Sequence, residues 1–170
     1  NLFGDSDYLE KLSLKGDPLE RLEKVVDFEC FRPTLNRIFK YDLKNKSHGG
    51  RPPYDLVLML KILILQRLYN LSDDAMEYQM IDRISFRRFL KIDDKVPDAK
   101  TIWNFRNQLS KSNRGNWLFS AFQEKIESQG MIAHKGQIVD ATFIALHLLN
   151  HMKFLEKMMV TMLIILLEFL

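Results

Sequence analysis

The chain of 170 residues has 46% hydrophobic side chains, enough for a real core, and 28% charged ones, an ordinary share for a soluble protein. Its one cysteine, Cys30, excludes a disulfide within these residues, fits a reducing compartment and is expected to be a small core residue. Residues 1–30 carry four basic and eight acidic side chains, whereas residues 31–70 carry eight basic and two acidic ones. This basic middle favours a polyanion such as nucleic acid as partner, and an ordinary solvated charged surface is the simpler alternative.

The first helical signal comes at Asp17, and residues 1–16 before it are expected to be a flexible N-terminus. Asp17 followed by Pro18 is typical of an N-cap with proline in the first turn of a helix. Apolar side chains then recur at helical spacing until Pro33, which breaks or restarts the helix. Residues 44–55, KNKSHGGRPPYD, are rich in glycine, proline and basic side chains, which predicts an exposed linker.

The strongest single element is a helix that Asp55 caps, LVLMLKILILQRLYN (residues 56–70), which is apolar on nearly every face. Lys61 interrupts it, and it is shorter than the roughly 20 residues that span a bilayer. We therefore expect a central buried helix around which other helices pack.

Three more helices are predicted after it. Ser72 is expected to cap the first of them, Ser85 to open a short basic helix, and Asp98 to cap AKTIWNFRNQLSK. A further helical stretch ends near Gly130, so residues 17–130 indicate a mainly α fold, a bundle of about six short helices.

One predicted helix carries a polar stripe that suits DNA. On a helix, positions i, i+4, i+7 and i+11 share one face, and apolar side chains lie opposite. Amides and lysines on a narrow face can contact base edges and phosphates, as a helix-turn-helix recognition helix does, although a solvated helix face is the simpler alternative. Trp103 and Trp117 are expected in the core. The candidate DNA-binding residues are Lys100, Thr101, Asn104, Asn107 and Lys111 on this helix, and Arg83, Arg87 and Arg88 on the helix before it.

A strand period appears only at residues 137–144, so a different kind of structure is expected to begin there. Its centre holds Asp140, a carboxylate that costs several kcal/mol if it is buried without a partner or a metal. Three stretches, GRPPYDLVLMLKILILQRLYNLSDDAMEYQMIDRISFRRFL (50–90), VPDAKTIWNFRNQL (96–109) and GQIVDATFI (136–144), together resemble bacterial insertion-sequence DDE transposases of the InsH type.

The resemblance implies a helical DNA-binding domain over residues 17–130 and, at 131–144, the start of an RNase-H-like α/β catalytic domain. It also implies that Asp140 is the first acid of the catalytic triad and a ligand of Mg²⁺ or Mn²⁺. In that family three acids hold two metal ions that cut and join DNA by in-line displacement. Implied partners are double-stranded DNA at the element's terminal repeats and further transposase copies, with no membrane. The implied location is the bacterial cytoplasm, at the nucleoid.

After Ile144 the resemblance stops, and residues 145–170 form an apolar tail, ALHLLNHMKFLEKMMVTMLIILLEFL, as a shifted reading frame would produce. The second Asp and the Glu of the triad are missing from these residues. We therefore expect a transposase fragment that is catalytically inactive. A stand-alone DNA-binding inhibitor of transposition is the alternative, and a helical protein without a DNA role is a third possibility.

Overall fold

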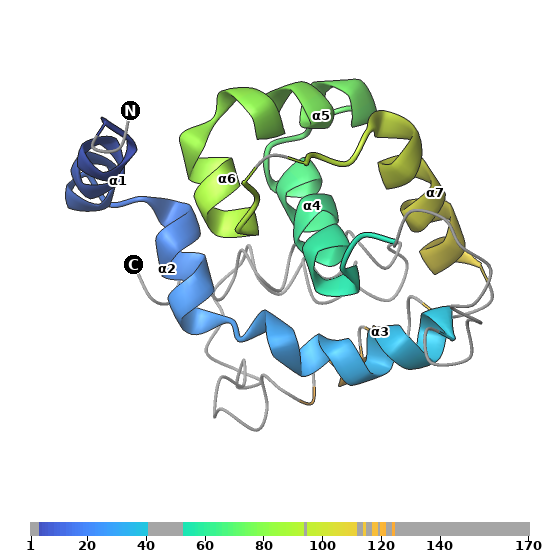
Figure 1. Cartoon of the computed structure of the whole chain (residues 1–170). Coiled ribbons are helices and arrows are strands. Elements are labelled where there is room, and N and C mark those ends of the chain that lie inside the picture. The colour runs from blue at the N-terminus through green and yellow to red at the C-terminus, as the bar shows by residue number, and fades with distance from the viewer. Residues whose placement is uncertain are drawn as a thin grey trace, which may run out of the picture.

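The computed structural model describes residues 4–40, 53–93 and 95–111, together with single positions between 114 and 124. Within these residues the chain forms seven α-helices and one 3₁₀ helix, and no strand (Figure 1). The mainly α fold predicted from the sequence is thus confirmed for this part of the chain. The predicted strand at 137–144 and the apolar tail at 145–170 lie outside the described residues.

Helix α1 (Gly4–Leu14) occupies a segment that was expected to be flexible. A tertiary contact explains the difference, because the guanidinium of Arg88 on α6 reaches across to α1. It donates hydrogen bonds to the carbonyl oxygen of Leu9 at 3.2 Å and to the hydroxyl of Ser13 at 2.8 Å. This contact has no local signature in the first sixteen residues.

The next three elements follow the chain past Pro33. Helix α2 (Pro18–Val25) has Asp17 as its N-cap, as predicted. The 3₁₀ helix η1 (Phe28–Phe31) leads directly into α3 (Arg32–Phe39), whose first turn contains Pro33. Proline therefore restarts the helix here rather than ending it, since its fixed φ suits a first turn.

Helix α4 (Leu56–Leu68) is the centre of the molecule, and ten of its thirteen residues are buried. The carboxylate of Asp55 caps it by accepting from the backbone N–H groups of Val57 and Leu58. Figure 1 shows α4 enclosed by the other helices, and it contacts η1, α3, α5, α6 and α7. The central buried helix predicted from composition is confirmed. Among the described residues no helix has the length and apolar character to cross a membrane.

Helices α5 (Asp73–Asp82) and α7 (Ala99–Ser110) have the predicted caps. The hydroxyl of Ser72 accepts a hydrogen bond at the start of α5, and the carboxylate of Asp98 does so at the start of α7. The two helices pack against each other along one side of α4. Cys30 packs against the core, as expected.

Helix α6 (Ile84–Leu90) begins one residue before the predicted opening residue, Ser85. Its N-cap position is held by Arg83, whose side chain makes no capping hydrogen bond. The prediction for Ser85 is therefore wrong. The helix is stabilised by burial of its phenylalanines in the core instead of by a cap.

An ionic network ties α4, α5 and α7 together at Asp73. Arg106 on α7 donates to both carboxylate oxygens of Asp73 at 2.6 Å, and Gln66 on α4 donates to one of them at 2.6 Å. The hydrogen bonds from Arg106 and then from Gln66 hold the pKa of Asp73 below its usual range, and burial offsets this only in part.

Acid should therefore weaken the contribution of Asp73 to stability. Because the folded-state pKa is lowered, this contribution is present above the ordinary value of 3.8 and is lost as the pH falls through the folded-state pKa. We expect Asp73→Asn to cost about 1 kcal/mol of unfolding free energy at pH 7 and little near pH 2, by urea titration. Asp74→Asn, at an exposed neighbouring position, is the control and should cost much less than Asp73→Asn at pH 7. A constant cost of Asp73→Asn at both pH values would contradict this account.

Candidate nucleic-acid interface

Helix α7 presents one polar face and one apolar face. Ile102, Phe105 and Leu109 are buried against the core. Lys100, Asn104 and Asn107 lie on the opposite side and are exposed, and Thr101 at the edge is half-buried. Lys111 is exposed as well, at the C-cap position directly after the helix. Within the described part of the chain, none of the four forms an ion pair. We call these four the α7 polar face: Lys100, Asn104, Asn107 and Lys111.

Trp103 lies beside the α7 polar face and is 50% exposed, so the expectation that it belongs to the core is wrong. The same expectation is wrong for Trp117, which is 49% exposed. The physical reason is that α7 fills its share of the core with Phe105, which stacks on Phe39 of α3 at 4.8 Å between ring centroids. Hydrophobicity predicts that a side chain favours burial, but the packing of neighbouring helices decides which positions have room.

The stacking of Phe105 on Phe39 brings the end of α3 close to α7. Two cations at the end of α3, Arg37 and Lys40, therefore lie near the α7 polar face, and neither is among the DNA-binding residues predicted from the sequence. Arg37 and Lys40 are both exposed, and the Arg37 guanidinium lies over the Trp117 ring at 5.9 Å from its centroid. A shallow hollow of about 170 Å³ lies between this region and α7, lined in part by Phe39 and Asn104. The only sequence signal for these cations is the basic excess of residues 31–70.

The three arginines of the α6 region are placed differently from the α7 polar face. Figure 1 shows α4 between α6 and α7. Arg83 is exposed and lies over the rings of Tyr69 and Phe86, at 5.3 and 5.2 Å from their centroids. Arg87 donates to the carbonyl oxygen of Asp93.

Arg88 is the most enclosed of these arginines. It pairs with Asp17, whose side chain is 3% exposed, in addition to its two hydrogen bonds to α1. A guanidinium whose donors are already bound to a buried carboxylate has little left for a phosphate. Its position indicates a structural contact among α1, α2 and α6.

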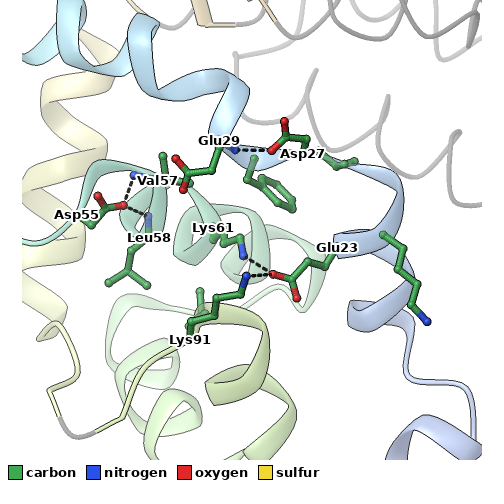
Figure 2. A pocket seen from close by; sticks show the side chains of 12 residues that line it. Glu23, Asp27, Glu29, Asp55, Val57, Leu58, Lys61 and Lys91 are labelled. Atoms are coloured by element: carbon green, nitrogen blue, oxygen red, sulfur yellow. Dashed lines mark hydrogen bonds and ion pairs between the residues drawn. The ribbon is translucent and has the colours of Figure 1, made fainter.

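The pocket in Figure 2 concentrates carboxylates, which raises the question of a metal or acid–base site. It has a volume of about 520 Å³ and lies between α2, η1 and α4. Lys61 and Lys91 donate to Glu23 at 3.2 and 3.0 Å. Arg32 pairs with Glu29 at 2.6 Å and with Asp55 at 2.5 Å.

These pairs settle the charge state of the pocket. Arg32 holds the pKa of Glu29 below its usual range. Burial raises the pKa of Asp55, but the hydrogen bonds from Arg32 and the backbone N–H groups outweigh it, so the pKa is lowered. The carboxylates of Glu29 and Asp55 are thus ionised at neutral pH, and those of Glu23, Glu29 and Asp55 are each paired with a cation of the chain itself. Among the described residues, no three metal-ligating side chains are grouped to hold an ion.

A comparison with known families identifies the domain that carries these features. Residues 6–108 match the model of the family described as Transposase domain (DUF772). The chain belongs to this transposase domain family. No solved structure matches it.

The transposase domain match begins in α1 and ends two residues before the end of α7. It contains most of the α7 polar face and Trp103, and it stops before Lys111. Asp140, which the resemblance implies to be the first catalytic acid, lies outside both the match and the described residues.

Proposed function

We propose that this transposase domain binds double-stranded DNA through the α7 polar face, and that its target is the terminal repeats of an insertion sequence. The observation that carries the proposal is the exposure of these lysines and amides on a helix whose opposite side is fixed in the core. Such a helix can enter the major groove without unfolding any packed contact.

In this proposal α7 is the recognition helix, and α5 is the helix that packs against it, with α6 between the two in the chain. Two contacts support α7 from the α5 side and leave its polar face open. Glu77 accepts from the backbone N–H of Ala99 at 2.7 Å, and Asp73 binds Arg106. Rigid support matters because base contacts need donors and acceptors held within a few tenths of an ångström.

The proposal divides the residues by the chemistry of their groups. Asn104 and Asn107 contact base edges, because an amide can donate and accept at once. Lys100 and Lys111 contact phosphates, together with the exposed cations Arg37 and Lys40 at the end of α3. Arg87 and Arg88 are not used for phosphates in this proposal, because both already donate within the chain. Arg83 is exposed and stays a candidate phosphate contact.

Fluorescence anisotropy with labelled duplex, using the full chain, tests these roles. Lys100→Ala and Lys111→Ala should weaken binding to all duplexes alike, and each should reduce the slope of log affinity against log salt by about 1. Asn104→Ala or Asn107→Ala should narrow the gap between terminal-repeat and random duplex by about 1–3 kcal/mol.

Lys24→Ala is the matched control, since Lys24 on α2 has the same charge and its side chain is 73% exposed. It should leave both affinity and salt slope unchanged. If the Lys24 and Lys100 variants lose affinity equally, only the net charge of the chain matters and the α7 polar face is not the binding surface.

A further inference from the structure

Trp103 is the one feature of this surface that groove binding does not require. Its side chain is half exposed on α7, although burial of an indole is among the most favourable contributions a core can receive. Along the helix, Lys100 precedes it by three positions and Asn107 follows it by four, so both are its neighbours on the surface. A cation, an aromatic ring and an amide therefore lie together.

The ring is also held on a rigid support. Phe105 on the opposite side of α7 stacks on Phe39 with an interplanar angle of 3°. Arg106, the neighbour of Trp103 on the side of α5, is fixed by Asp73. Binding then loses little conformational entropy, because a tryptophan side chain on an ordered helix has only two torsions to fix.

We propose that Trp103 stacks on an unstacked base, so that the preferred ligand of this surface is duplex DNA next to an unpaired nucleotide. This inference rests on the function proposed above. In a fully paired duplex the base faces are covered by their neighbours, and a helix in the groove meets only base edges. An indole gains a stacking partner where a base is free, at a frayed end, a bulge or a single-stranded flank.

The neighbours of Trp103 fit such a ligand. Stacking on an aromatic ring is tolerant of sequence because every base has a π-face, so Trp103 would add affinity without adding base preference. Lys100 is placed to neutralise the phosphate of the stacked nucleotide, and Asn107 can donate to or accept from its edge. Sequence preference stays with the amides of the α7 polar face.

The test compares four DNAs of one sequence by anisotropy with the full chain: a paired duplex, a duplex with a frayed end, a duplex with a single-base bulge, and a single strand. Wild type should bind at least one of the unpaired DNAs about tenfold more tightly than the paired duplex. Trp103→Ala should lose this preference and Trp103→Phe should keep most of it. Tyr78→Ala, a 63% exposed aromatic on α5, should change nothing. The DNA that wild type binds most tightly relative to the paired duplex shows whether the free base comes from a frayed end, a bulge or a single strand.

A second measurement keeps Trp103 in place, so its result does not depend on whether the Trp103→Ala variant folds. The chain has two tryptophans, so Trp117→Phe leaves Trp103 as the only indole. The DNAs with an unpaired base should quench the fluorescence of Trp103 and should also protect the indole from quenching by iodide. The paired duplex should have much smaller effects of both kinds. Equal preference in wild type and Trp103→Ala, or no fluorescence change, overturns the inference alone. Failure of wild type to bind any of the DNAs overturns the proposed function as well.

Discussion

Replacing Arg88 by methionine is expected to lower the free energy of unfolding by about 3 kcal/mol, because the change leaves a buried carboxylate without its cation. The side chain of Asp17 is 3% exposed, and Arg88 is its ion-pair partner. Methionine keeps the apolar stem that lies beneath the guanidinium, so the loss reports the charge and hydrogen bonds rather than packing. Urea unfolding followed by circular dichroism measures the change.

Two further variants test whether the loss of stability comes from the unpaired charge of Asp17. Asp17→Asn retains an oxygen that can accept from Leu19 N–H at the start of α2, and it removes the buried charge. The double variant with Arg88→Met should therefore be more stable than Arg88→Met alone. Arg87→Met serves as a control with a small effect, since Arg87 donates only to a backbone carbonyl in the described structure. A stable Arg88→Met protein with reduced affinity for every duplex would instead restore Arg88 as a phosphate contact.

Removing Glu23 is expected to cost about 2 kcal/mol of unfolding free energy, because Lys61 would lose its carboxylate partner inside the core. Lys61 is 7% exposed, and its ammonium also donates to the carbonyl oxygen of Phe89 at 2.8 Å. It lies 4.6 Å from the centroid of the Phe89 ring and 5.1 Å from that of Phe28. The ring faces and the carbonyl share the positive charge, but neither neutralises it.

Burial by itself would raise the pKa of Glu23, but the hydrogen bonds from Lys91 and Lys61 outweigh burial and hold the pKa below its usual range. Glu23 is therefore ionised at neutral pH, and its pair with Lys61 is best tested by a double-mutant cycle. Lys61→Met should change stability by no more than about 1 kcal/mol, since an apolar chain of similar length replaces the ion pair. In that background Glu23→Ala should cost much less than in wild type.

The control for this cycle is Lys24→Ala, which breaks the exposed pair of Lys24 with Glu20 and should leave stability nearly unchanged. Chemical denaturation of all variants at pH 7 gives the coupling energy. If Glu23→Ala costs the same with lysine or methionine at position 61, the two side chains do not stabilise each other and Figure 2 shows only their proximity.

Local chemistry determined where most helices begin. Asp17, Asp55, Ser72 and Asp98 each accept from a backbone N–H two or three residues ahead, so the whole interaction is contained in a short stretch of sequence. The burial of α4 was equally predictable, because a helix that is apolar on nearly every face has no side to turn to water. The two faces of α7 follow from its residue spacing for the same reason.

Tertiary structure alone decided which charged and aromatic groups are available to a ligand. Arg88 and Trp103 could not be assigned from their neighbours in the chain. The partner of Arg88 is 71 positions away, so nothing near Arg88 in the chain indicates that its charge is neutralised inside the fold. Trp103 is exposed because Phe105 and Phe39 fill the space between α7 and α3. A sequence fixes which groups a helix carries, but close packing of helices distant in the chain fixes which of them face solvent.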